Sequence, residues 1–299
     1  MVIKKRGILI TLIVLLLLVF FLYWENNSLD ISRYDLSYDK LPEGFDGYRI
    51  VQISDMHGKT FGRKNSALAS KIKKLKPDLL IATGDMMSST INDGGAFLDF
   101  LDSFDNACPV YMSLGNHEQI ARWLLDGNNN VNYERFIAEV KKRGVRLLDN
   151  ERVFIEKNGD TLALAGLTIE LYHYSRRDLD PYDESLFLKQ SYIDNVLGKP
   201  PEAFTVLMAH NPAYFKEYTA WGADLILSGH VHGGVIQVPF KGGLLSPEHV
   251  FFPEYDAGLF EEDGSKMIVN RGLGYSVINF RLFNRPDVSL IELNRTQSH

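Results

Sequence analysis

Five short polar motifs stand in order along the chain, and their side chains are of the kinds that bind metal ions. They are Asp55-x-His57, Gly84-Asp85, Gly115-Asn116-His117-Glu118, His210 and Gly229-His230-Val231-His232. Together they supply two aspartates, one asparagine and four histidines, with one further histidine left over. This mixture of carboxylate, amide and imidazole groups is the ligand set of a hydrolytic centre that holds two metal ions.

Each motif follows a short apolar run that the composition predicts to be a buried strand. The runs occupy residues 48–54, 78–83, 109–114, 204–209 and 224–228. They are rich in Val, Ile and Leu and tend to be bounded by Gly or Pro, as buried strands often are. Because the carboxyl ends of strands form the ligand crevice of a layered α/β protein, the five loops are expected to converge on one point.

The spacing within the motifs favours shared ligation. Residues two apart in an extended chain face the same side, so Asp55 with His57, and His230 with His232, can each direct two ligands one way. Asp85 has two carboxylate oxygens and can bridge two ions. Two divalent cations with two carboxylates leave the centre positively charged, which suits a phosphoryl group and lowers the pKa of a bound water from ~15.7 towards ~7.

The motifs resemble those of the calcineurin-like metallophosphoesterase superfamily over residues 48–293. The resemblance implies that a first metal is bound by Asp55, His57 and His232, and a second by Asn116, His210 and His230. It implies that Asp85 bridges the two metals. It identifies His117 as a catalytic histidine that is not a ligand, and that stabilises the transferring phosphoryl group or protonates the leaving oxygen. Manganese, iron or zinc suits such a ligand set better than calcium does.

Two longer stretches narrow the resemblance. Residues 52–62 and 229–259 are similar to the bacterial membrane-associated branch that includes YkuE- and YaeI-type phosphoesterases. Some members of that branch cleave the pyrophosphate of a UDP-diacylglucosamine. The resemblance therefore implies a phosphoester substrate that is lipid-linked or belongs to the cell envelope.

Each motif taken singly has an ordinary structural explanation. A lone Asp-x-His is more often part of a turn, Gly-Asn-His-Glu can be a loop with a helix cap, and His210 can be a loop histidine. Glu118 is as consistent with a supporting or capping carboxylate as with catalysis. The occurrence of all five motifs in the order of the superfamily favours the metal centre.

Two classes of function are consistent with these residues. The first is a metal-dependent hydrolase of a phosphodiester or pyrophosphate bond, such as that of a UDP-diacylated sugar, with a phosphomonoesterase or phosphoprotein phosphatase as the alternative. Phosphoprotein phosphatases usually follow the bridging aspartate with Val-Asp-Arg-Gly, whereas this chain has Asp85-Met-Met-Ser-Ser89. The second class is a metal-binding scaffold without turnover, and the complete ligand set with His117 argues against it.

The N-terminus predicts a membrane anchor. Residues 2–7 are basic and residues 8–24 are apolar but for Thr11 and the closing Tyr23 and Trp24. As a helix this run rises about 26 Å, close to a ~30 Å hydrocarbon core. No small-x-small cleavage site follows, which favours an anchor over a signal peptide. Cations before the span and acids after it favour a single-pass protein of the cell membrane, with its catalytic domain outside the cytoplasm.

The expected organisation is a signal anchor at residues 1–24, a polar linker at 25–47 and a metallophosphoesterase domain at 48–299. A net charge of −6 and the lack of a basic stripe argue against a nucleic-acid partner. The single Cys108 excludes an internal disulfide. Nothing in the sequence indicates the oligomeric state.

The alternation of strands and helices predicts the fold. Apolar spacing and a Pro or Gly stop indicate helices at residues 64–76, 132–143 and 184–197. Further strands are predicted at 146–148, 153–156, 161–167, 235–238, 267–270 and 288–293. We therefore expect an α/β four-layer sandwich, in which two mixed β-sheets are flanked by helices as in metallo-dependent phosphatases, preceded by one transmembrane helix.

Candidates for substrate contacts lie in several loops. Cations that can contact phosphate or sugar are His173, Arg176, Arg177, Arg271, Arg281 and Arg285. Leu244-Leu245 and the apolar run 250–253 can form an acyl groove or a lip that faces the bilayer, although such loop residues are more often simply packed down. The sequence assigns none of them a definite role.

Overall fold

Two mixed sheets form the inner layers of the computed structural model, which describes residues 2–89, 94–124, 127–174, 187–275 and 278–296. The first sheet has the strand order β1 (Asp30–Tyr38), β14 (Asp287–Arg295), β2 (Tyr48–Ile53), β3 (Leu79–Thr83), β4 (Val110–Ser113), β5 (Arg146–Leu147). The second has the order β12 (Gly258–Glu262), β13 (Ser265–Val269), β9 (Leu225–Ser228), β8 (Phe204–Ala209), β7 (Asp160–Leu167), β6 (Glu151–Lys157).

Both sheets are parallel at the strands that precede the motifs. In the first sheet β2, β3, β4 and β5 run parallel, and β14 is antiparallel to β2. In the second sheet β7, β8, β9 and β13 run parallel, with β6 and β12 antiparallel at the edges. Parallel strands place their carboxyl ends at one edge of a sheet, so the loops that carry the motifs gather there.

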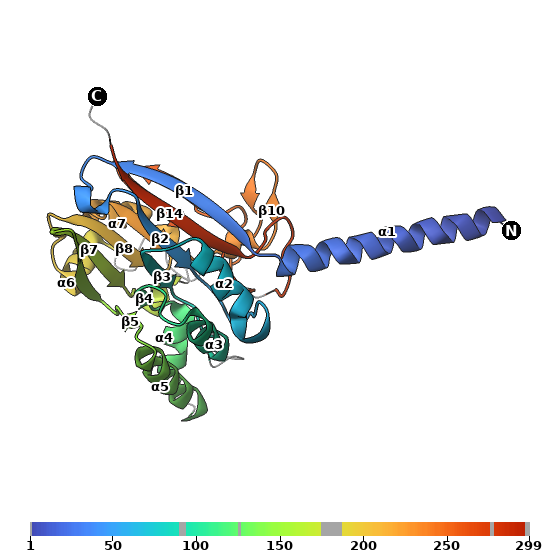
Figure 1. Ribbon diagram of the computed structural model, residues 1–299, viewed down its shortest axis with the longest axis horizontal. Coiled ribbons are helices and arrows are strands. Elements are labelled where there is room, and N and C mark those ends of the chain that lie inside the picture. The colour runs from blue at the N-terminus through green and yellow to red at the C-terminus, as the bar shows by residue number, and fades with distance from the viewer. Residues whose placement is uncertain (1, 90–93, 125–126, 175–186, 276–277, 297–299) are drawn as a thin grey trace.

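Helices cover the outer faces of the two sheets (Figure 1). Those associated with the first sheet are α2 (Ser66–Lys74), α3 (Gly95–Phe104), α4 (Asn116–Trp123) and α5 (Gly127–Lys142). Those on the second are α6 (Gln190–Leu197) and α7 (Phe215–Trp221). A further helix, α1 (Val2–Asn27), projects away from the body.

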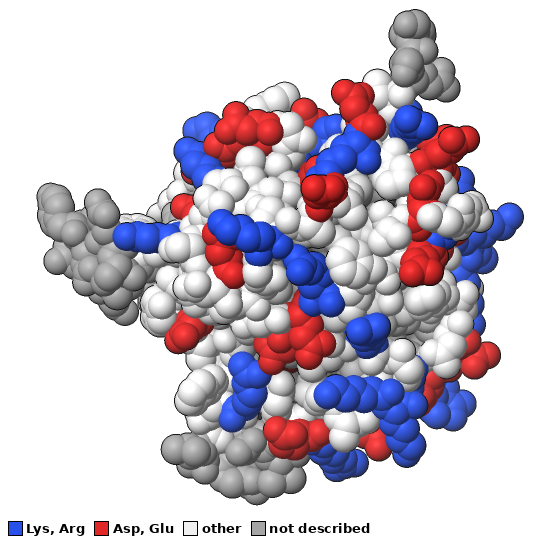
Figure 2. Space-filling view, turned by 90° about the vertical axis from the view of Figure 1, so that its left-hand side faces the viewer, with Lys and Arg blue, Asp and Glu red and all other residues white. Residues whose placement is uncertain are grey.

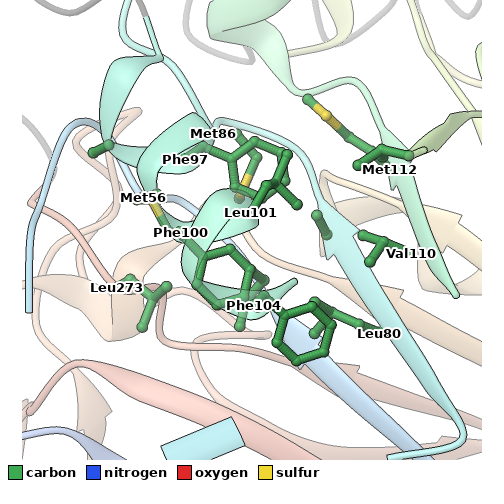
Figure 3. Close-up of a cluster of buried hydrophobic side chains, with 14 of the residues drawn as sticks. Met56, Leu80, Met86, Phe97, Phe100, Leu101, Phe104, Val110, Met112 and Leu273 are labelled. Atoms are coloured by element: carbon green, nitrogen blue, oxygen red, sulfur yellow. The ribbon is translucent and has the colours of Figure 1, made fainter. Parts of the chain in front are cut away.

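Three clusters of buried apolar side chains hold the layers together. One lies between the sheets, where Ile50 and Ile81 meet Leu164 and Val206. A second lies between the first sheet and its helices and contains the aromatic rings of α3, seen in Figure 3 beside Leu80 and Val110. The third packs α6 and α7 on the second sheet. This arrangement confirms the predicted four-layer α/β sandwich.

The segment expected as a polar linker contains a strand. Residues 30–38 form β1, which pairs in parallel with β14 along its whole length. Leu36 and Tyr38 are buried while the alternate residues Asp35 and Ser37 are exposed. A strand with one polar face resembles a linker in composition, which explains why the expectation for residues 25–47 differs from the structure.

Three predicted elements are shorter or displaced. The helix expected at 64–76 begins at Ser66, because Lys64 and Asn65 have left-handed φ angles of 52° and 54°. Val235 has a φ of 62°, so the strand expected at 235–238 reduces to β10 (Gln237–Val238), which pairs with β11 (Gly242–Gly243) outside both sheets. The helix expected at 184–197 begins at Gln190 within the described residues, and its first residues lie outside them.

Candidate metal centre

The structure brings the motifs together where strand ends of the two sheets meet. Asp55 follows β2, Asp85 follows β3, and Asn116 begins the helix that follows β4. From the second sheet, His210 follows β8, and His230 lies two residues after β9. All the predicted ligands therefore come from loops at the carboxyl ends of central strands, as the sequence indicated.

The backbone that presents these side chains is not extended. Five of the predicted ligands have positive φ angles of 43° to 68°, and these are Asp55, His57, Asp85, His230 and His232. The expectation that residues two apart face the same side of an extended chain is therefore wrong, although the paired side chains still converge. Left-handed conformations are costly for residues other than glycine, and such strain is concentrated at functional sites.

Glycines allow the motif loops to approach one another closely at this point. A Cβ atom on Gly115 would overlap the carboxylate of Asp85 from the neighbouring strand of the same sheet, and one on Gly229 would overlap Ser54 and Asp55 of the other sheet. The missing side chain of Gly229 lets Asp55 accept hydrogen bonds from the backbone N–H of His230, at 3.1 Å and 3.0 Å. A motif of the second sheet thereby fixes the carboxylate of the first.

The donor atoms fall into overlapping groups of the size that a metal ion requires. Ligand atoms of Asp55, His57 and His232 lie within 4.8 Å of one another, and so do those of Asp85, His210 and His230. The distance from His232 Nε2 to Asp55 Oδ1 is 3.3 Å, and that from His210 Nε2 to Asp85 Oδ2 is 3.1 Å.

Asp85 joins the two groups. Its Oδ2 lies 3.6 Å from His57 Nε2 as well as close to His210. A third group, formed by His57, Asp85 and His117, has the same spread. One carboxylate thus stands between both sets of imidazoles, which is the position that a bridging ligand requires.

Two buried polar atoms at this point make no hydrogen bond within the part of the chain that the structure describes. They are Asn116 Oδ1 and His210 Nε2, both shielded from solvent, and His210 Nε2 faces the carboxylate of Asp85. The other ring nitrogen of His210, Nδ1, lies 2.6 Å from the carbonyl oxygen of Thr83 and donates to it, so Nε2 is the nitrogen that faces the centre. Buried polar atoms without a hydrogen bond are costly, and a cation bound between them satisfies them. The residues therefore fit a metal ion.

The pKa values of the histidines at this point also favour a bound cation. Burial lowers the pKa of His57 to about 4 and also lowers that of His232, so both rings are neutral and able to ligate. Burial alone would lower the pKa of His210, but the charges of Asp85 and Asp55 raise it to about 10. The same two carboxylates that attract a proton to this ring would also attract a metal cation placed between them.

Glu118 supports the loop of Asp85. Its carboxylate accepts hydrogen bonds from the backbone N–H groups of Asp85, Met87 and Gly115, at 2.8, 3.1 and 2.9 Å. Burial and the charge of Asp85 nevertheless raise the pKa of Glu118 to about 7. The residue therefore acts as the supporting carboxylate, one of the two roles that the sequence left open.

His117 lies beside the centre with one nitrogen already engaged. The backbone N–H of Ser89 donates to His117 Nδ1 at 3.1 Å, and the N–H of His117 donates to Asp85 Oδ1 at 2.8 Å. Because Nδ1 accepts a hydrogen bond, the proton of the neutral ring resides on Nε2. The His117 and His57 rings are 4.6 Å apart, so that proton lies close to the expected metals. No motif in the sequence pointed to the contribution of Ser89.

Glu248 is a second residue that the sequence did not single out. Its Oε1 is hydrogen-bonded to His230 Nε2, which leaves His230 Nδ1 to face the centre. Burial would raise the pKa of Glu248, but His230 lowers it to about 2. The carboxylate thus orients a predicted metal ligand from outside, as partners of metal-binding histidines commonly do.

We expect Glu248→Ala to weaken metal binding without unfolding the protein. Loss of the orienting carboxylate should reduce affinity for the metal that His230 contacts by ~10- to 100-fold, whereas Glu248→Gln should retain most of it by accepting the same hydrogen bond. Metal titration measures this, with Glu254→Ala as the neighbouring control. Equal affinities for wild type and Glu248→Ala would contradict the assignment.

The arginines considered for phosphate contacts have structural roles instead. Arg281 is buried, and its guanidinium donates to the carbonyl oxygens of Gly274 and Arg271. Arg271 pairs with Asp30 and Asp287, and Arg285 lies near Asp30 and Glu25. Arg271 and Arg285 thus pair with carboxylates where β1 and β14 begin, whereas backbone carbonyl oxygens hold Arg281.

The other candidates for phosphate contacts are one buried histidine and two arginines outside the part of the chain that the structure describes. His173 is buried, with its ring against Tyr172, Tyr192 and Tyr214. That packing argues against a direct role in binding phosphate. Arg176 and Arg177 lie outside the described residues.

The fold and the convergent carboxylates and imidazoles define a metallophosphoesterase. The family model of calcineurin-like phosphoesterases matches residues 48–234, which is more than half of the chain. The chain therefore belongs to the calcineurin-like phosphoesterase family, and it is a metal-dependent phosphoric ester hydrolase.

Bacterial relatives match nearly the whole chain. The metallophosphoesterase YkuE of Bacillus subtilis is 25% identical over 279 residues, covering 92% of this chain and 88% of YkuE. The phosphodiesterase YaeI of Escherichia coli is 26% identical over 283 residues, covering 91% and 90%. The UDP-2,3-diacylglucosamine pyrophosphatase LpxG of Chlamydia muridarum is 26% identical over 307 residues, covering 89% and 90%. The chain is thus similar to the bacterial branch that its motifs indicated.

Proposed function

We propose that the seven residues implied by the resemblance bind two transition-metal ions, and that the protein hydrolyses a phosphodiester or pyrophosphate bond. The observation that carries the proposal is the convergence of two overlapping ligand groups around Asp85, beside two buried atoms, Asn116 Oδ1 and His210 Nε2, that make no hydrogen bond within the described residues. Asp55, His57 and His232 bind one ion in this proposal, Asp85 bridges, and Asn116, His210 and His230 bind the other. Manganese, iron and zinc all suit these ligands.

The protein itself contributes orientation and a proton. When bound, two divalent ions would polarise the phosphoryl oxygens and supply hydroxide at neutral pH. Glu118 holds the backbone of the Asp85 loop, and Thr83 fixes the tautomer of His210. His117 holds a proton on Nε2, where it can be donated to the departing oxygen.

The relatives and the N-terminal helix support a substrate held in or near a membrane. YaeI is named as a phosphodiesterase and LpxG as a pyrophosphatase of a diacylated nucleotide sugar. In this chain we propose a lipid-linked or envelope substrate of the same chemical kind. The two apolar acyl chains of such a substrate would remain in the bilayer while its phosphoester reaches the centre.

An assay of the purified full-length chain tests this proposal. The protein is loaded separately with manganese, iron and zinc and given a phosphomonoester, a phosphodiester and a UDP-diacylated sugar. We expect the diester and the pyrophosphate of the sugar to be cleaved faster than the monoester. Preference for the monoester would instead make the protein a phosphomonoesterase, and no turnover with any metal would indicate a scaffold.

We further propose that α1 anchors the protein in the membrane. The most apolar 18-residue window within Arg6–Asn27 has a mean hydropathy of 2.8, and none of that window is buried against the body. Figure 1 shows the helix extending from the end of the domain. An apolar surface of this length is unstable in water and matches the thickness of a bilayer.

The charges around α1 predict its orientation. Lys4, Lys5 and Arg6 precede the apolar run, so we expect the catalytic domain outside the cytoplasm. A reporter that is active only outside the cytoplasm, fused after His299, should be active, and the mature chain should retain residues 1–24. Activity of a cytoplasmic reporter at the same position would reverse the orientation, and a shortened N-terminus would make the helix a signal peptide.

A further inference from the structure

Six exposed apolar side chains lie on loops near the end of α1. They form what we call the apolar rim, which consists of Phe240, Val250, Phe251, Phe252, Ile278 and Phe283. Phe240 is fully exposed, and Phe251 and Phe283 are 67% and 56% exposed. On the face away from α1, by contrast, acidic and basic side chains are interspersed (Figure 2). Soluble proteins rarely gather large exposed aromatic residues in this way unless the surface binds something.

The rim is fixed to the base of α1. The side chain of Asn26 donates to the carbonyl oxygen of Arg281 at 3.0 Å and accepts from its N–H at 2.8 Å. The ring of Phe283 lies 5.9 Å from that of Phe21. Phe21 belongs to the apolar segment proposed to enter the bilayer, so Phe283 lies at the depth of a membrane-embedded residue.

Backbone hydrogen bonds place the β10–β11 hairpin and Phe252 near Phe283. Gln237 of β10 donates to the carbonyl oxygen of Leu282 at 3.1 Å, which places the β10–β11 hairpin beside Phe283. The backbone N–H of Phe252 donates to the carbonyl oxygen of Leu244 at 3.1 Å, which holds Phe252 beside the end of the hairpin. Figure 1 shows β10 at the same end of the domain as α1. The hairpin, Phe252 and Phe283 therefore lie at the end of the domain from which α1 extends.

Lysines stand beside the rim as they do at membrane surfaces. Lys59 Nζ lies 2.9 Å from Asn27 Oδ1, at the end of α1. Lys241 Nζ lies 5.8 Å from the centre of the Phe252 ring. Aromatic rings next to lysines are typical of segments that rest in the headgroup region, where the rings enter the acyl boundary and the ammonium groups meet lipid phosphates.

The rim also adjoins the metal centre. A cavity of about 100 Å³ is lined by Val250 of the rim, by Glu248, which binds His230, and by Tyr174. The ring of Tyr174 lies 5.0 Å from that of His230. If the rim rests on the bilayer, this cavity opens next to the lipid surface.

We propose that the apolar rim is a second membrane-contact surface, which inserts into the leaflet that α1 enters and holds the metal centre at the lipid surface. This inference rests on the proposed anchoring by α1. The domain then contacts the membrane through its own loops as well as through α1. A lipid-linked substrate can then reach the centre without leaving the bilayer.

Spin labels on the full-length chain in lipid nanodiscs test the inference. In a Cys108→Ala background, single labels are placed at Phe251→Cys and Phe283→Cys in the rim. Leu15→Cys in α1 serves as the bilayer reference, and Phe154→Cys, an equally exposed ring on β6, as the aqueous control. Collisions of each label with oxygen, which enters lipid, and with a water-soluble nickel chelate are compared.

We expect the oxygen-to-nickel collision ratio at both rim positions to approach that of Leu15→Cys and to exceed that of Phe154→Cys. Rim labels that match Phe154→Cys, while Leu15→Cys remains in lipid, would overturn the docking surface and leave the anchor intact. An aqueous ratio at Leu15→Cys would refute the anchor, and the docking surface with it.

Discussion

Replacing Asp85 with alanine is expected to remove bound metal and activity together. Asp85 lies between both groups of imidazoles, 3.1 Å from His210 and 3.6 Å from His57, so its loss affects both proposed metal sites. Each ion stabilises the transition state by several kcal/mol, and we expect kcat/KM to fall by about 10⁴-fold or more. Metal analysis and kinetics on the same preparation measure the two losses.

A second variant separates this effect from misfolding. Asp85→Asn retains the shape of the side chain and an oxygen that can accept the N–H of His117, but it lacks the charge. We expect it to fold and still to lose metal. Asp149→Asn, which alters a carboxylate paired with Arg122 outside the centre, is the matched control and should retain both metal and activity. Full activity of Asp85→Asn with intact metal content would show that this carboxylate does not bridge.

His117→Ala is expected to separate metal binding from chemistry. The ring completes neither proposed coordination sphere, so both metals should stay bound. Removing a positioned acid should lower kcat by ~10²- to 10⁴-fold for substrates with a basic leaving group. A leaving group of low pKa needs no proton and should be affected much less. Equal losses for all leaving groups would point to electrostatic stabilisation of the phosphoryl oxygens instead.

Ser89→Ala is the control for this histidine. It removes the hydroxyl beside His117 Nδ1 but keeps the backbone N–H that fixes the tautomer. Its kcat should therefore fall much less than that of His117→Ala. If His117→Ala kept full activity on every substrate at unchanged metal content, the catalytic role proposed for His117 would be wrong.

The sequence predicted the convergence of the site because the information is local. Each motif follows a run of apolar residues, and the position of strand ends in an α/β sandwich follows from those runs. The strand β1 was not predicted, since its alternate residues face solvent and give the segment a polar composition. The helix α3 carries apolar residues at helical spacing, at Phe97, Phe100, Leu101 and Phe104, and this signal could have been used.

The supporting residues could not be predicted because their partners are distant in the chain. Asn26 and Arg281 are separated by 255 positions, and only the folded chain brings them together. Arg281 resembles a phosphate contact in sequence, yet burial against backbone carbonyls gives it a structural role. Glu248 has no motif around it, and its contact with His230 depends on how the loop between β11 and β12 packs.

The number of metal ions bound per chain tests the proposed centre most directly. Elemental analysis of the full-length protein, reconstituted with manganese, iron or zinc and freed of excess metal, should give two ions per chain. His210→Ala should lower this number to one, because His210 belongs to only one of the two proposed coordination spheres. One ion or none in the wild-type chain would contradict the dinuclear centre.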